Sequence, residues 1–141
     1  MSDLNRFRAE HENLEVIAGR LSEMIAQDAP PSSRELYVVR MELASALIHH
    51  LKSEDWMLYP RLLVSSDRGV ADVARAFSKE MGGLAKAFSD YAQHWGANVI
   101  EGNWEGYQRE TAKILDALTL RMAREERDLY PLLELPIRVA A

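Results

Sequence analysis

The sequence predicts an all-α protein, an up-down-up-down four-helix bundle that forms a single domain over residues 1–141. Apolar residues recur at spacings of three and four in four long stretches, which is the pattern of amphipathic helices. Short connections separate these stretches, and no segment has the alternating pattern of a strand. With 48% hydrophobic residues, the chain can bury one core of ordinary size.

An internal repeat supports two helical hairpins of one design. The segment 50–60, HLKSEDWMLYP, returns at an offset of 71 residues as 121–131, RMAREERDLYP. At an offset of 70 residues, EHENL at 10–14 aligns with EMGGL at 80–84. The first copy therefore carries His, His and Glu where the second carries Met, Arg and Glu.

The first helix is expected from Leu4 and should end by Ala29, because the prolines at 30 and 31 cannot continue it. His11 falls on its apolar stripe. Ser32 or Ser33 can cap the second helix. The inward seam of the second helix is expected to carry Leu36, Arg40, Leu43, Leu47, His50, Glu54, Met57 and Arg61.

The third helix is expected to run from Val70 to Trp95, after a turn at 65–69, with Met81 on its inward seam. Glycines at 96 and 102 then interrupt the pattern. The fourth helix follows from Trp104 to Leu129, and the apolar tail after 131 is expected to pack as an irregular cap or to fray. Arg121 and Glu125 lie on the fourth seam, so they should face the bundle axis.

Composition excludes several classes of function. The chain has no cysteine, which removes disulfides, thiolate nucleophiles and cysteine-bound metal clusters. A net charge of -5 without a basic stripe argues against nucleic acid as a partner. No apolar run approaches a membrane span and the N-terminus has no signal-peptide core, so the sequence predicts a soluble cytoplasmic protein. No sequence motif of the common hydrolases or kinases is present.

Four ionisable residues should meet at one depth of such a bundle: His11, His50, Glu54 and Glu125. Imidazole and carboxylate ligands suit iron, manganese or zinc, and bundle cores are where such sites are built. Each residue taken singly is more often an ordinary polar core residue. Jointly they favour a metal site, because burying several ionisable groups is costly unless they are paired or coordinate a metal.

The other candidates point to structure. His49 faces away from the seam, which favours a surface or interface position, and His94 lies too far from Met81 to join the same site. The aromatic residues at helical spacing indicate core packing. Trp56 falls between the seam rows, where an exposed tryptophan can mark a homodimer contact.

The motifs EH at 10–11, HxxxEDxxLYP at 50–60 and EExxLYP at 125–131 resemble the hemerythrin-like, or HHE cation-binding, domain family over nearly the whole chain. The resemblance implies a four-helix bundle around a non-haem di-iron centre that binds dioxygen reversibly or senses oxygen, nitric oxide or redox state. It implies His11, His50, Glu54 and Glu125 as ligands, with the two carboxylates as bridges.

The departures from the family all fall on the second metal position. Met81 and Ala85 stand where the family places histidines on the third helix, and Arg121 stands where it begins the fourth-helix motif with a histidine. A guanidinium can pair with the oxygens that a second cation would use. Two carboxylates, one arginine and two divalent ions sum to an excess of three positive charges, so the sequence predicts at most one metal ion.

Three functions remain open from the sequence. The first is a metal-binding protein that holds one non-haem iron ion and senses dioxygen, nitric oxide or redox state. The second is a metal-free regulatory or interaction module with a protein partner, in which Arg121 replaces the metal between Glu54 and Glu125. An enzyme is the weakest of the three, because no substrate pocket is evident in the sequence.

Overall fold

The computed structural model describes residues 3–134, in which every regular element is helical, so the all-α prediction is confirmed. The elements are α1 (Asp3–Ile25), α2 (Ser33–Met57), α3 (Tyr59–Leu63), α4 (Arg68–Met81), α5 (Leu84–His94), α6 (Ala97–Gly102), α7 (Trp104–Arg124), a π-helical turn η1 (Glu125–Leu129) and a 3-10 turn η2 (Tyr130–Glu134). Most of the tail predicted to cap or fray lies outside the described residues. No helix within residues 3–134 is long and apolar enough to cross a membrane.

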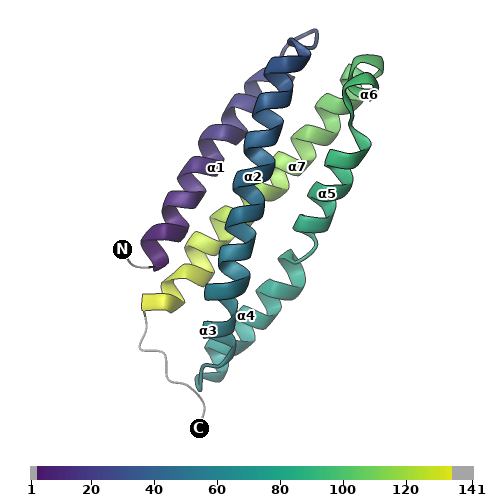
Figure 1. Cartoon of the computed structure of the whole chain (residues 1–141). Coiled ribbons are helices and arrows are strands. Elements are labelled where there is room, and N and C mark those ends of the chain that lie inside the picture. The colour runs from purple at the N-terminus through teal and green to yellow at the C-terminus, as the bar shows by residue number, and fades with distance from the viewer. Residues whose placement is uncertain (1–2, 135–141) are drawn as a thin grey trace.

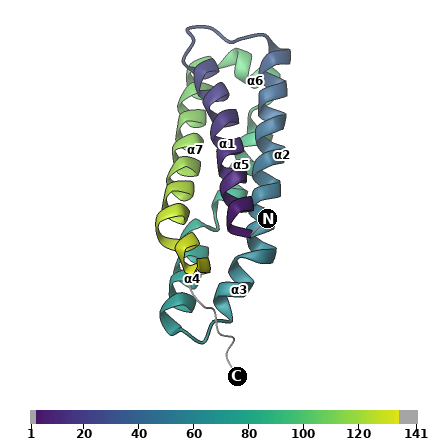
Figure 2. The same cartoon turned by 90° about the vertical axis from the view of Figure 1, so that its left-hand side faces the viewer.

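The long helices lie side by side and form a bundle (Figure 1). Helix α1 packs against both α2 and α7, and Figure 2 shows it between them. Ser32 caps α2, because its hydroxyl accepts a hydrogen bond from the Glu35 backbone N–H at 3.2 Å. The predicted start of the second helix is therefore correct, and α1 ends before Ala29 as expected.

The second helix is shorter than predicted. It ends at Met57, and the chain turns at Leu58 before α3 begins with Pro60 in its first turn. Proline is tolerated there because the first N–H groups of a helix lack intrahelical partners. The turn moves Arg61 off the seam: its side chain is 49% exposed and pairs with Asp3 at 3.4 Å. The prediction that Arg61 faces inward is wrong.

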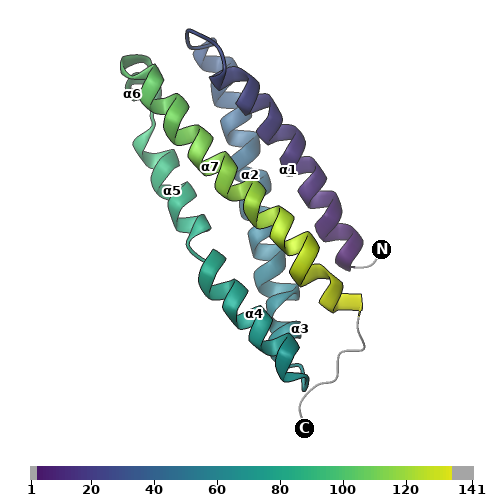
Figure 3. The same cartoon turned by 180° about the vertical axis from the view of Figure 1, so that it is seen from behind.

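The predicted third helix is two helices, α4 and α5, separated at Gly82 and Gly83 (Figure 3). Glycine is the least favourable residue in a helix interior after proline, and two in succession remove the side-chain packing that would hold a continuous helix. Trp95 lies just beyond α5 instead of within it. The prediction of one helix from Val70 to Trp95 is corrected accordingly.

The apolar core has two parts with a polar layer between them. The larger cluster includes Leu14 and Leu47, and the smaller includes Phe7 and Leu58. His11 lies between Phe7 and Leu14 along α1, and His50 follows Leu47 on α2 and precedes Leu58, which comes directly after that helix. The polar side chains are thus enclosed on both sides by packed apolar groups, which keeps water away from them.

Candidate metal centre

All four predicted ligands meet in the polar layer. His11 comes from α1, His50 and Glu54 from α2, and Glu125 from η1, and one ligand atom of each lies within 4.8 Å of the others. Each of the four side chains is at most 2% exposed. The spacing of His50 and Glu54, one helical turn apart, places both on the same inward face. Such a group could hold a metal ion.

The two imidazoles face one another through the same ring nitrogen. His11 Nε2 lies 3.0 Å from His50 Nε2. At their other ends, His11 Nδ1 is 2.9 Å from Glu126 Oε1 and His50 Nδ1 is 2.7 Å from Glu10 Oε1. A carboxylate only accepts hydrogen bonds, so each Nδ1 carries the proton and donates it. Both Nε2 atoms are then left with a lone pair directed at the centre.

Glu10 and Glu126 are themselves held by arginines from the first turns of α1. Arg6 lies 3.9 Å from Glu10 and Arg8 lies 3.2 Å from Glu126. Carboxylates that accept from the distal nitrogen of a ligating histidine fix its tautomer and ring orientation and raise its basicity. The two histidines are therefore each oriented for a ligand at Nε2 by a carboxylate that an arginine of α1 approaches.

Two neutral imidazoles cannot remain 3.0 Å apart with their lone pairs facing, so this position needs a proton or a metal cation. Burial alone would lower the pKa of His50, but the nearby carboxylates of Glu125, Glu54 and Glu10 outweigh it and raise the pKa to about 10. In the metal-free protein the shared proton is therefore on His50, which donates toward His11 or Glu54, 3.2 Å away.

Arg121 bridges the two central carboxylates from the opposite side. Its Nη2 donates to Glu54 Oε1 at 3.2 Å, and its Nε lies 3.5 Å from Glu125 Oε2. Its Nη1 donates to the Met81 carbonyl at 3.1 Å, at the C-terminal end of α4, where carbonyls lack intrahelical donors. The break at Gly82 thus supplies the third partner of the guanidinium. This arrangement fits the expectation that a fixed positive charge takes the place of a second cation.

Tyr130 also belongs to the cluster and contacts two of the predicted ligands. Its hydroxyl lies 2.8 Å from His11 Nε2 and donates to Glu54 Oε2 at 2.9 Å. The π-helical turn η1 places it there, because the Tyr130 N–H bonds to the Glu125 carbonyl five residues earlier and puts both side chains on one face. Burial, followed by the charges of Glu54 and Glu125, raises the pKa of Tyr130, so it remains a phenol.

The two carboxylates differ in electrostatics although both are fully buried. Burial raises the pKa of Glu54 to about 7, with the hydrogen bond from His50 opposing it. Burial opposes ionisation of Glu125 too, but the neighbouring imidazoles of His11 and His50 and the guanidinium of Arg121 hold its pKa below the usual range. Glu125 is therefore the permanent anion of the site, and Glu54 is the carboxylate whose charge responds to its partners.

Three buried polar atoms on the arginine side have no hydrogen-bond partner among the described residues: Glu125 Oε2, Arg121 Nε and Tyr59 Oη. Glu125 therefore keeps an oxygen available to a cation or a small polar molecule. The donor set fits one metal ion, which His11, His50, Glu54 and Glu125 would hold. On the other side of the two carboxylates lies Arg121, and Met81 offers no imidazole there.

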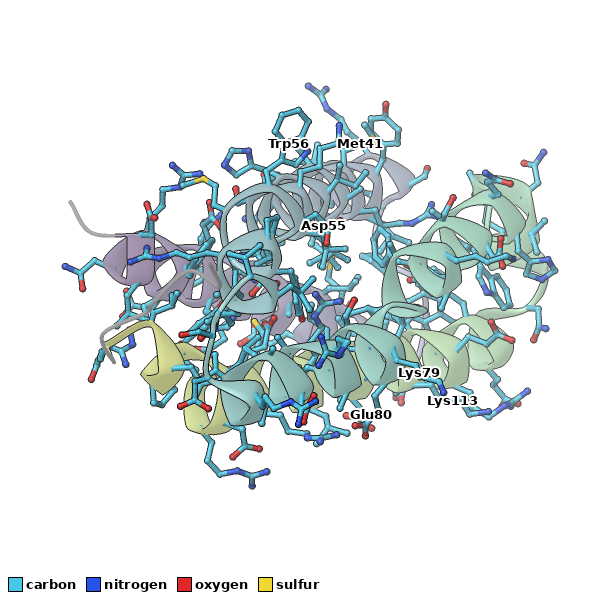
Figure 4. All side chains as sticks on the ribbon, turned by 90° about the horizontal axis from the view of Figure 1, so that it is seen from below. Met41, Asp55, Trp56, Lys79, Glu80 and Lys113 are labelled. Carbon is cyan, nitrogen blue, oxygen red and sulfur yellow. The ribbon has the colours of Figure 1, made fainter. Side chains whose placement is uncertain are left out.

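The remaining candidates lie outside the cluster. His49 is 70% exposed and reaches only the second oxygen of Glu10, at 3.2 Å, so its predicted surface position is confirmed. His94 is exposed and lies against the Trp95 ring at the far end of α5. Trp56 is 82% exposed on the outer side of α2 (Figure 4). Ala85, where the family carries a further histidine, is also exposed.

Three residues of the cluster were not predicted from the sequence: Glu10, Glu126 and Tyr130. The two acidic residues are sequence neighbours of His11 and Glu125, and this adjacency was the available signal. The Leu-Tyr-Pro triplet that ends both repeats was the signal for Tyr130. Only one of the two tyrosines joins the site, since the Tyr59 hydroxyl finds no partner among the described residues.

Comparison with known proteins agrees with this geometry. A family model described as the hemerythrin HHE cation-binding domain matches residues 2–133. No significant match to a curated protein or to a solved structure was found. The family match spans nearly the whole chain and includes every residue of the buried cluster. The chain therefore belongs to the hemerythrin HHE cation-binding domain family.

Proposed function

We propose that this protein binds one non-haem iron ion through His11, His50, Glu54 and Glu125 and senses dioxygen, nitric oxide or redox state. The supporting observation is the pair of Nε2 atoms 3.0 Å apart, in two imidazoles whose Nδ1 atoms each face a carboxylate. Two nitrogen lone pairs that face each other at this distance repel, and a metal cation or a shared proton between them removes the repulsion. Neutral imidazole and carboxylate ligands suit iron as they suit manganese or zinc, and the chain belongs to a cation-binding family.

Each group of the cluster has a distinct part in this proposal. When bound, the iron ion would supply redox chemistry and affinity for small diatomic molecules. Glu10 and Glu126 hold the imidazoles in the binding tautomer. Tyr130 holds Glu54 by donating to its outer oxygen. The enclosing apolar clusters exclude water, which strengthens the interaction between the ion and the carboxylates.

Arg121 limits the site to one ion. With a divalent ion and neutral histidines, the two central carboxylates and Arg121 leave one positive charge, which the outer carboxylates Glu10 and Glu126 can offset. A second divalent ion would raise this excess to three charges next to a guanidinium that cannot be deprotonated. The proposal includes the predicted single domain and up-down-up-down helix order, while the cytoplasmic location and a homodimer or regulatory partner remain predictions.

Iron content provides the direct test. Protein expressed with iron and purified anaerobically should contain at most about one iron per chain, because only one side of the cluster offers imidazoles. Elemental analysis together with the near-ultraviolet spectrum after exposure to air measures this. Two irons per chain with an oxo-bridge absorption band would overturn the single-ion proposal.

The outer carboxylates should control affinity. Replacing Glu126 with alanine removes the acceptor at His11 Nδ1, so the ring can turn or take the other tautomer, and iron affinity should fall roughly 10- to 100-fold. Competition with a ferrous chelator under anaerobic conditions measures the change. Glu12→Ala, at an exposed position of the same helix, is the matched control. Equal affinity of Glu126→Ala and the parent would show that Glu126 does not orient a ligand.

The alternative is a metal-free regulatory or interaction module. It is favoured by the charge balance of the cluster itself, since ionised Glu54 and Glu125, Arg121 and a protonated His50 sum to zero. In that case purified protein loaded with iron would contain far less than one ion per chain, and added iron would not raise its melting temperature. A stoichiometric increase in melting temperature with ferrous iron would exclude the module.

A further inference from the structure

A groove lies between α2 and the α5–α6 region, toward the end of the bundle where α1 joins α2. Its volume is about 760 Å³, within the range of small-molecule sites in proteins. The lining is mainly apolar and includes the buried side chains Leu36, Leu43, Phe88, Tyr91, Trp95 and Ile100. Three of these are aromatic, so the groove offers flat surfaces that suit an apolar ligand.

Arg40 is the one basic side chain among the residues that line this groove. Two contacts fix the Arg40 guanidinium. It donates a hydrogen bond to the backbone carbonyl of Trp95, and it lies over the Tyr107 ring, 5.7 Å from the ring centroid. Within residues 3–134 it forms no ion pair with a carboxylate. The acidic side chain at the groove, Glu101, is exposed on α6 and does not neutralise it. A half-buried, oriented cation without a counter-ion favours an anionic ligand group.

The groove is separate from the metal centre. Leu43 lines the groove, whereas His50 lies seven residues farther along α2, about 10 Å away by the rise of a helix. The buried Leu47 layer lies between them. None of the predicted metal ligands lines the groove, so occupation of one site does not require the other.

From these observations we propose that the groove binds an apolar monocarboxylic acid. Its hydrocarbon body would lie against the aromatic and aliphatic wall, and its carboxylate would pair with Arg40. The planar guanidinium can form two parallel hydrogen bonds to a carboxylate, and the bond that already holds it to Trp95 reduces the entropy lost on binding. This site does not depend on the proposed metal function.

Calorimetric titration of the purified full chain with sodium octanoate tests the proposal, with 1-octanol as the uncharged probe of the same length. Octanoate should bind saturably with one molecule per chain, and octanol at least about tenfold more weakly, because a charged hydrogen-bonded pair at a half-buried site contributes about that factor. Arg40→Gln should weaken octanoate about tenfold and leave octanol unchanged. Arg109→Gln, at an exposed arginine outside the groove, should change neither.

A second variant tests the groove wall without removing a core side chain. Ala92 is exposed and lines the groove, so the indole of Ala92→Trp should obstruct it and reduce the affinity for both probes at least tenfold while helical content stays unchanged. Absence of saturable octanoate binding to the parent would overturn the proposal. Octanoate affinity that is the same in Arg40→Gln or in folded Ala92→Trp as in the parent would overturn it as well.

Discussion

Replacing Arg121 with alanine should destabilise the metal-free protein by roughly 3 to 5 kcal/mol, the usual cost of removing one partner from a buried ion pair. Arg121 is about 6% exposed and lies against Glu54 and Glu125, which are both fully buried. Without the guanidinium, two carboxylates would face each other with one protonated histidine. For a chain of this size the melting temperature should fall by roughly 10 °C or more.

Arg124→Ala is the matched control for this prediction. Arg124 is on the same helix and pairs with Glu80, but both side chains are partly exposed, so the loss should be about 1 kcal/mol or less. If Arg121 stands in for a cation, ferrous iron or Mn²⁺ should raise the melting temperature of Arg121→Ala more than that of the parent. An unchanged melting temperature in Arg121→Ala would remove the idea that this arginine replaces a metal ion.

The centre of the site could be predicted because the repeat and the helical period agree. The internal repeat aligns His50 with Arg121 and Glu54 with Glu125 in the sequence. The helical period of 3.6 residues then predicts that all four side chains face the bundle axis. Burial then followed from the apolar residues on both sides. Arg121 contacts both carboxylates, as the charge-replacement hypothesis requires.

The outer carboxylates were not predicted, because sequence adjacency to a ligand does not show how far a side chain reaches across helices. Glu10 and Glu126 fall beside the seam, where acidic residues are ordinarily solvated, and Glu126 is indeed 37% exposed. Only the approach of α1 to α2 and η1 brings their oxygens to the imidazoles. The change from α- to π-helical hydrogen bonding after Arg124 has no signature in residue spacing, so the contact of Tyr130 with His11 was hidden too.

The third helix was mispredicted for a different physical reason. The apolar spacing continues across Gly82 and Gly83, so the helical period by itself predicts one continuous helix. The low helix propensity of two adjacent glycines outweighs that period and breaks the helix. The break has a structural consequence at the site, since the Met81 carbonyl at the end of α4 accepts from Arg121. A continuous helix would use that carbonyl internally and leave the guanidinium one partner short.

Restoring histidines at the second metal position should raise the iron content from at most about one ion to about two ions per chain. The double variant Met81→His and Arg121→His supplies two imidazoles at the positions aligned with His11 and His50. Positions 81 and 121 are adjacent in the structure, because Arg121 donates to the Met81 carbonyl. The change also removes the fixed charge that would repel a second ion.

Carboxylate oxygens are already available on that side. Glu125 Oε2 has no hydrogen-bond partner within the described residues, and Glu54 Oε1 would lose its contact with Arg121. Both carboxylates could then bridge two ions, with imidazoles on each side. Each single variant should bind less iron than the double variant. Arg121→His keeps Met81, so the second position lacks a ligand, and Met81→His keeps Arg121, whose charge repels the ion.

The measurement is metal content together with the near-ultraviolet spectrum after aerobic iron loading. A control variant, Lys79→His with Arg124→His, adds two histidines to the same helices outside the cluster and should bind no more iron than the parent. The double variant should also melt at a lower temperature than the parent when metal-free and recover stability on loading, because the ions then replace the lost guanidinium. A double variant with intact helical content that binds no more iron than the parent would show that residues 81 and 121 do not converge on the second position.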